Sequence, residues 1–452
     1  MAFSRRAFLR HLVFLKGWLS LDFPLDEAFG SNGPVASARP ASEIWRSVNG
    51  SPAENLEKVI AMLGGIGRIV GEADVVVIKP NFQWWNQGAP NLAALRRFIE
   101  IVMERPGGFR GEVVVAENCH RGPSPGDSMN AGWAHPFARN SDLPGIKNAN
   151  DLTDLIKRKY GDRFTARHWI DVRSGGRRVS GPADGEEGYV YCDGTGGVPL
   201  LRCDNGLAGG RFRAAIMTYP VFRTDMGTMV DFRKGVWEKG TYTGRQMRYI
   251  NFAAVNHHST YCGLTSSIKN YLGVTDLSGG PDPHDDGRLT PQYHNFHSFP
   301  FDKWRPGPRP GALGKAVGTF LSIVRRADLN VATAEWVGLS SRTEPPVART
   351  RAVLASTDPL ALDYHVAKYL LYPNSRIRVH DPEFREGPLR QYLETACQAA
   401  GGCLKEGDVA VHSFDLGRGR QQRAEELPVC GDIVWGRDPK GLLKYLYLRS
   451  VG

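Results

Sequence analysis

Two short β-branched stretches set the fold class: DVVVI at residues 74–78 and EVVVA at residues 112–116. Apolar runs of this length are typical of strands that are buried on both faces. Between them, residues 91–104 have the pattern of a helix. A strand, a helix and a second strand in this order form a right-handed crossover between parallel neighbours. The stretches therefore predict an α/β fold around a parallel sheet.

The same alternation continues along the chain. Ser51 is expected to cap a helix. Further helices and strands are expected at residues 151–160, 249–255, 264–272, 317–326, 329–334 and 352–356, followed by a helix from Pro359 with Thr357 or Asp358 as its N-cap. Residues 118–245 are rich in Gly, Asp and Arg and predict long loops with hairpins. The whole predicts a mixed, mainly parallel sheet with flanking helices and long loop insertions. It forms one large domain over residues 39–452, or two lobes separated by the loop-rich insertion.

The N-terminus has the pattern of a twin-arginine signal peptide. Residues 4–10 read SRRAFLR, a weakly apolar stretch follows at 12–23, and VASA at 35–38 supplies the small residues of a cleavage site. We therefore expect residues 1–38 to be a signal peptide, the twin-arginine translocase to be a partner, and the periplasm or another extracytoplasmic space to be the location. The alternative is a basic cytosolic N-terminus that contains two arginines by chance. No later segment is apolar enough for a transmembrane helix, so none is expected in the mature chain.

The chain is basic, with a formal charge of +10. Residues 39–452 keep +9, because the first 38 residues contain four basic and three acidic ones. The arginines are scattered, and no basic helix or aromatic platform predicts a nucleic-acid surface. The charge is compatible with an anionic ligand, and equally with a well-solvated surface.

The spacing of the seven cysteines argues against metal sites built from cysteine pairs. None of them forms a C-x-x-C pair, so no iron–sulfur cluster or zinc ribbon is expected. In an oxidising compartment Cys397 can pair with Cys403 and Cys192 with Cys203. Whether any disulfide forms stays open at this point.

Three segments resemble the domain-of-unknown-function 362 family. They are VIKPN at residues 77–81, NHH at 256–258 leading to SIKNYLGV at 267–274, and VLASTDPLALD at 353–363. Together they span most of the chain, from about residue 74 to residue 371. The resemblance implies an α/β fold but little about function. Some relatives carry ferredoxin-like cysteine segments, which this chain lacks, and it also departs from the family pattern near Glu335.

Polar residues follow several of the predicted strands. Because ligands of open α/β sheets bind beyond the carboxyl ends of the strands, these side chains are expected to share one rim. The candidates are Lys79, Asn81, Glu117, His257, His258, Glu335 and Asp358. The alternative is that polar residues end these strands only because loops begin there.

Lys269 and Asn270 form the sharpest candidate pair. A lysine within an apolar, glycine-bounded segment can bind phosphate or carboxylate, or act as a base if burial lowers its pKa. The alternative is a surface lysine beside a capping asparagine.

A divalent metal is the remaining possibility for a cofactor. His257, His294 and His297 lie close in sequence to the carboxylates of Asp282, Asp285 and Asp286, and His294 and His297 are one helical turn apart. Their spacing matches no established metal-site class, and histidines in such a loop are often surface residues.

These observations predict an exported α/β enzyme of unknown reaction that binds an anionic small molecule, a metal or another cofactor in a strand-end cleft. We expect Lys79, His258 and Lys269 to be catalytic. Asn81, Asn270, Glu117, Glu335 and Asp358 are expected to bind the ligand. The alternative is a non-catalytic binding or scaffold protein for a metal or an anionic ligand.

Overall fold

A large mixed sheet runs through the unit formed by Ser42–Gly452. The computed structural model describes residues 42–119, 131–194, 196–204, 214–259, 261–277, 310–402 and 409–451. The sheet has eleven strands, of which nine follow the order β18-β17-β1-β16-β15-β13-β2-β3-β4. Their bounds are β1 Ser42–Val48, β2 Val75–Lys79, β3 Glu112–Cys119, β4 Phe164–Ile170, β13 Met247–His257, β15 Leu329–Gly338, β16 Val347–Ser356, β17 Val409–Asp415 and β18 Arg420–Gln421.

Most of these strands are parallel, as predicted. β4, β3, β2, β13 and β15 form a continuous parallel array. β16 runs antiparallel to both β15 and β1, and β17 is parallel to β1. The reversal at β16 has a simple cause, because residues 339–346 are too few to cross back over the sheet and can only form a hairpin-like connection. Short strands β14 (Leu264–Thr265) and β19 (Asp432–Val434) add antiparallel pairs to β13 and β16.

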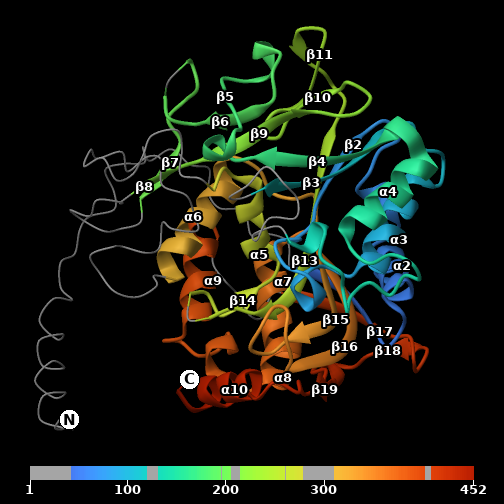
Figure 1. Ribbon diagram of the computed structural model, residues 1–452, viewed down its shortest axis with the longest axis vertical. Coiled ribbons are helices and arrows are strands. Elements are labelled where there is room, and N and C mark those ends of the chain that lie inside the picture. Colours follow the sequence, from blue (N-terminus) through green and yellow to red (C-terminus); the bar gives the residue numbers. More distant parts are fainter. Residues whose placement is uncertain are drawn as a thin grey trace, which may run out of the picture. The chain divides into compact units, whose positions relative to one another are not determined.

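The β-branched runs are buried on both faces, which explains their composition. Val75 and Val77 point to one core, whereas Val76 and Ile78 point to the other. Helices α2 (Pro52–Met62), α3 (Leu92–Met103) and α4 (Ala149–Tyr160) cover the second face. Helices α5 (Ser267–Asn270), α6 (Pro310–Ile323), α7 (Pro359–Val366) and α9 (Pro388–Ala399) lie on the opposite side (Figure 1).

The predicted loop-rich insertion contains a second sheet. Its order is β12-β11-β10-β9-β6-β5, with bounds β5 Arg178–Val179, β6 Gly188–Tyr191, β9 Thr218–Arg223, β10 Met229–Asp231, β11 Gly235–Glu238 and β12 Thr241–Tyr242. Hairpins were expected here, but a layer with a buried aromatic core was not. Cys192, directly after β6, is a free and buried thiol. The side chain of Cys203 lies outside the described residues. Cys403 lies outside the described residues.

Helices α8 (Tyr372–Ser375) and α10 (Pro439–Val451) lie together at one end of the molecule (Figure 1). Among the described residues, no helix has both the length and the apolar character needed to cross a membrane. Residues 1–38, the predicted signal peptide, lie outside the described residues.

The cap of α7 yields a stability prediction. One carboxyl oxygen of Asp358 accepts from the backbone N–H groups of Leu360 at 2.9 Å and Ala361 at 3.2 Å, and the other accepts from the Ser42 hydroxyl at 2.7 Å. Asp358→Ala should lower the free energy of unfolding by about 1–2 kcal/mol, measured by urea unfolding. Asp358→Asn keeps an accepting oxygen and should lose much less. Equal losses in the two variants would show that the cap is not what Asp358 contributes.

Candidate functional site

A buried ion pair joins the carboxyl ends of β2 and β3. The ammonium nitrogen of Lys79 lies 2.9 Å from Oε1 of Glu117, and the two side chains are 2% and 4% exposed. Oε2 of Glu117 accepts from the backbone N–H of Phe82 at 2.8 Å and from the indole N–H of Trp133 at 3.4 Å. Burial lowers the pKa of Lys79 and raises that of Glu117, and their mutual attraction opposes both shifts. Both oxygens of the Glu117 carboxylate therefore accept hydrogen bonds from within the protein.

The side chain of Asn270 connects this pair to a polar network beneath α5. Its oxygen accepts from the Lys79 ammonium, and its amide donates to the Lys79 carbonyl at 3.1 Å and to Oδ1 of Asn251 at 2.7 Å. Asn251 in turn donates to Oδ1 of Asn330 and to the carbonyl of Ser267. The network crosses β2, β13 and β15, so it holds α5 in one position over three neighbouring strands.

Two further contacts fix this segment. Both carboxyl oxygens of Asp363, in α7, accept backbone N–H groups at the start of α5, from Ser267 at 2.7 Å and from Ile268 at 2.9 Å. Burial raises the pKa of Asp363 to about 7. Just after α5, a β-carbon at Gly273 would lie 2.6 Å from Cε of Lys79, so only glycine fits there.

Lys269 lies in a different environment from its neighbour Asn270. It is 8% exposed, and its ammonium nitrogen is 5.8 Å from the centre of the Tyr261 ring. No hydrogen bond or ion pair joins that ammonium to any residue that the structure describes. The pKa of Lys269 is lowered to about 8, mainly by burial; Cys262 acts in the opposite direction, and the positive charges of Arg342 and Lys79 contribute to the lowering.

Arg342 contributes a second positive charge from the connection between β15 and β16. Its guanidinium carbon lies 5.4 Å from the Trp84 ring, and burial lowers its pKa. The connection is held by Asn86, which donates to the Thr343 carbonyl at 3.0 Å, and by Gln87, which donates to the Glu344 carbonyl at 3.1 Å. Within the described ranges, Arg342 forms no ion pair with an acidic residue.

The histidines after β13 have separate roles. Nδ1 of His257 is 2.8 Å from Nε2 of His380, whose Nδ1 is 2.7 Å from the Ser375 hydroxyl. Burial lowers the pKa of both rings, that of His380 to about 3, and the charges of His380, Lys444 and Arg342 lower that of His257 further. Both rings are therefore neutral at neutral pH. The His258 ring lies beside the ring of Tyr261, 5.3 Å between centres, on which Lys269 also lies.

The structure brings together only part of the predicted rim. Lys79, Glu117 and Asn270 are in direct contact, and Asn81 is buried just beyond β2. Lys269 and His258 share the Tyr261 ring. Asp358 is an N-cap and lies away from this group.

Glu335 also lies elsewhere, because β15 does not end at Ala334. A bulge between Ala334 and Trp336 lets the strand continue to Gly338, so Glu335 is inside it. Its Oε1 accepts from Nε of Arg349 at 2.9 Å. Burial raises the pKa of Glu335, and the Arg349 charge opposes that shift.

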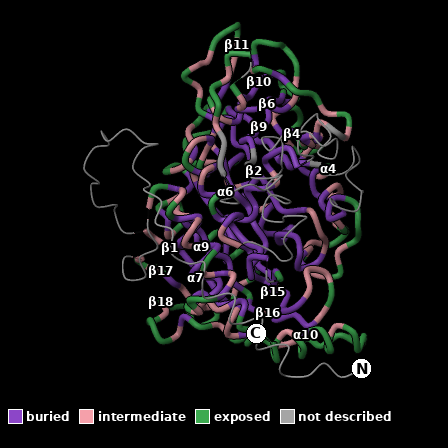
Figure 2. Tube along the Cα trace, turned by 90° about the vertical axis from the view of Figure 1, so that its left-hand side faces the viewer, coloured by how far each residue is buried: buried purple, intermediate pink, exposed green. Residues whose placement is uncertain are grey.

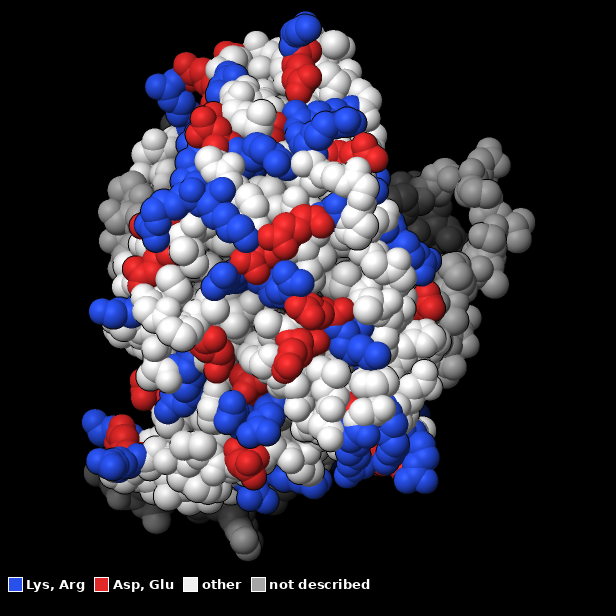
Figure 3. Space-filling view, turned by 90° about the vertical axis from the view of Figure 1, so that its right-hand side faces the viewer, with Lys and Arg blue, Asp and Glu red and all other residues white. Residues whose placement is uncertain are grey.

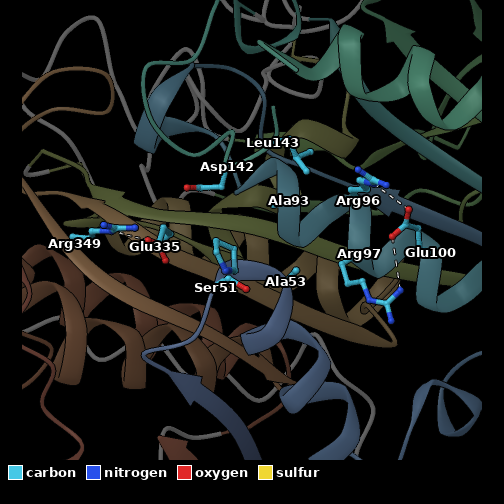
Figure 4. A pocket seen from close by; sticks show the side chains of 11 residues that line it. Ser51, Ala53, Ala93, Arg96, Arg97, Glu100, Asp142, Leu143, Glu335 and Arg349 are labelled. Atoms are coloured by element: carbon cyan, nitrogen blue, oxygen red, sulfur yellow. Dashed lines mark hydrogen bonds and ion pairs between the residues drawn. The ribbon is translucent and has the colours of Figure 1, made fainter. Parts of the chain in front are cut away.

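Glu335 lines a surface pocket of about 460 Å³ on the α2 and α3 side of the sheet. Figure 4 shows the Glu335–Arg349 pair at one end of this pocket and Arg96, Arg97 and Glu100 at the other. The cations here are already paired with acidic residues. Figure 3 shows that acidic and basic side chains also alternate over the surface on this side of the molecule. The pocket therefore offers a ligand little uncompensated charge.

The predicted metal ligands are not assembled in the described part of the chain. His294 and His297, with the nearby aspartates, lie outside the described residues. His257 is described, but one of its ring nitrogens is taken up by His380. Among the described residues, no group of three His, Cys, Asp or Glu side chains is arranged to hold a metal ion.

Several residues of the site were not found from the sequence. Arg342 and Tyr261 are in connections, where no periodicity marks them, and His380 is 123 positions from His257. Asp363 entered the sequence analysis only as the last residue of the segment 353–363, which carries part of the family resemblance. Burial and long-range contact identify these residues, and neither can be read from local spacing.

No family model matches this chain, and no curated protein or solved structure matches it either. The resemblance to the domain-of-unknown-function 362 family therefore stays a prediction.

The Lys79–Glu117 pair yields a second stability prediction. Glu117→Gln should lower the free energy of unfolding by about 3–5 kcal/mol, because it leaves a buried ammonium without its counter-charge. The matched control is Glu104→Gln, which removes an exposed pair with Lys159 and should cost about 1 kcal/mol or less. Urea unfolding of both variants measures the difference, and similar losses would contradict the role given to the buried pair.

Proposed function

We propose that this chain binds a small anionic ligand, a carboxylate or a phosphate ester, between Lys269 and Arg342. The observation that carries the proposal is the presence of a buried lysine and a half-buried arginine with no acidic partner among the described residues. A buried charge without a counter-charge is costly, and proteins normally pair it. Lys79, which contacts the adjacent residue Asn270, shows the paired arrangement. An anionic ligand would give Lys269 the negative counter-charge that Glu117 gives Lys79.

We further propose that the protein is an enzyme in which Lys269 transfers a proton. A lysine with a pKa near 8 is present in both protonation states close to neutral pH, which suits a general acid or base. Lys79 is then a positioning residue, since its ammonium is satisfied by Glu117 and Asn270 while its charge helps to lower the pKa of Lys269. His257 and His258 are neighbours of the site. The proposed place of action is outside the cytoplasm, on the sequence pattern of residues 4–10.

The protonation of Lys269 makes anion binding dependent on pH. Sulfate is a suitable probe, because its charge is constant between pH 7 and pH 9 and it resembles a phosphate group. Its affinity should fall roughly tenfold from pH 7 to pH 9 as Lys269 loses its proton. Isothermal calorimetry on the wild-type chain measures this change.

Two variants test whether Lys269 is the group responsible. Lys269→Met should abolish sulfate binding, whereas Lys157→Met, which removes a lysine paired with Asp225, should bind like the wild type. Sulfate binding that is unchanged in Lys269→Met would overturn the proposed site. Turnover of candidate phosphate or carboxylate esters that is lost in the same variant separates an enzyme from a plain binding protein.

Lys269 should also make stability depend on pH. Its pKa is about 8 when folded and near 10.5 when unfolded, so the unfolded state binds the extra proton between these values. The free energy of unfolding should therefore rise with pH across this window, by roughly 3 kcal/mol in total. Lys269→Met should lack this rise and be more stable than the wild type at pH 7. The difference between the two chains isolates Lys269 from tyrosines that titrate at high pH, and a variant less stable than the wild type at pH 7 would refute the argument.

A further inference from the structure

The C-terminal helix α10 leaves an unusual amount of apolar surface in contact with solvent. Seven large apolar residues between positions 434 and 451 are 39–64% exposed: Val434, Trp435, Leu442, Leu443, Leu446, Tyr447 and Val451. In the rest of the described chain only Leu200 and Met226 are comparable. Within α10 itself, Tyr445 is the buried residue. Figure 2 shows this helix as a largely exposed segment at the end of the domain.

Four exposed apolar residues of α10 lie on one side of the helix. At about 100° per residue, Leu442, Leu443, Leu446 and Tyr447 occupy an arc of roughly 140°. Tyr445 points to the other side, where its hydroxyl donates to the Ser375 carbonyl at 3.0 Å. The helix is therefore attached to the domain by one side and presents the apolar arc outward.

The charged residues of α10 itself are all positive. Lys440 and Lys444 lie along one edge of it and Arg449 lies along the other, and α10 contains no acidic residue. Arg437 adds a further cation just before the helix, against a single acid, Asp438. Leucines bordered by Lys and Arg, with aromatic residues beside them, are the composition of helices that lie in a membrane interface.

We infer that α10 docks on the surface of a bilayer that contains anionic lipids, with its apolar arc in the interface. A helix of 13 residues is about 20 Å long, which is too short to span a bilayer, so it lies on the membrane. A second copy of this chain is a poorer occupant. Self-association through the arc brings the cationic edges of two helices together, and these repel each other.

The docking surface is separate from the anion site, but Lys444 lies near residues around that site. Burial lowers the pKa of both His257 and Lys444; the charge of Lys444 also lowers that of His257, and the charge of Arg342 also lowers that of Lys444. One edge of the docking surface therefore adjoins the residues around His257 and Arg342.

Co-sedimentation with vesicles tests the inference. The full chain should sediment with vesicles of phosphatidylcholine and phosphatidylglycerol, and bind at least roughly tenfold more weakly to phosphatidylcholine alone or at high salt. Leu443→Asp/Leu446→Asp should lose this binding. The matched control is Leu200→Asp/Met226→Asp, which places the same charges on the other exposed apolar residues and should bind like the wild type. All variants keep the same N-terminal residues, so any binding by those residues contributes equally.

Three outcomes overturn the inference. The first is that the wild-type chain remains in the supernatant when it is mixed with anionic vesicles. The second is that the α10 double variant binds these vesicles as well as the wild type does. Alternatively, the wild type forms dimers without lipid in analytical ultracentrifugation and the α10 variant is monomeric, in which case the arc is a contact between copies of the chain. Unchanged sulfate binding in the α10 variant keeps this test separate from the proposed function and shows that the variant is folded.

Discussion

The buried pair of Lys79 and Glu117 is the interaction on which the candidate site depends. A lysine at the end of a central strand can remain in the core only if a carboxylate meets it and all remaining polar atoms are satisfied. Glu117 provides the charge, and Asn270 and the Phe82 backbone complete the hydrogen bonds. Gly273 leaves the space for the lysine stem. The short helix α5 is thereby fixed over the strand ends, with Asp363 holding its first residues.

The fixed position of α5 explains why two adjacent residues have opposite roles. Successive side chains on a helix diverge by about 100°, so when Asn270 faces Lys79, Lys269 must point elsewhere. It points toward Tyr261 and the surroundings of Arg342, where no acid of the described chain meets it. Among the described residues, two lysines are buried: Lys79 has an acidic partner and Lys269 has none. Because of this contrast, we propose a structural role for Lys79 and a ligand-binding role for Lys269.

The sequence predicted the fold class and the proximity of the polar residues at the ends of β2 and β3, because both follow from local patterns. The β-branched runs identified β2 and β3, and the strand-end rule placed Lys79 and Glu117 together. Glu335 was misplaced because a bulge, which has no sequence signature here, extends β15 and directs the side chain to another partner. Asp358 was better understood as a cap than as a ligand. The second sheet was predicted only as loops with hairpins. Its strands have two to six residues and lie among glycines, so no long apolar pattern marks them in the sequence.

The histidines connect the site to the end of the domain without adding charge to it. His257 contacts His380, His380 contacts Ser375, and the carbonyl of Ser375 accepts from Tyr445 in α10. A proton on either ring would add a third positive charge beside Arg342 and Lys444. Burial keeps both rings neutral instead, so neither histidine adds a positive charge to the site. The link from α10 to the site therefore runs through hydrogen bonds between neutral groups.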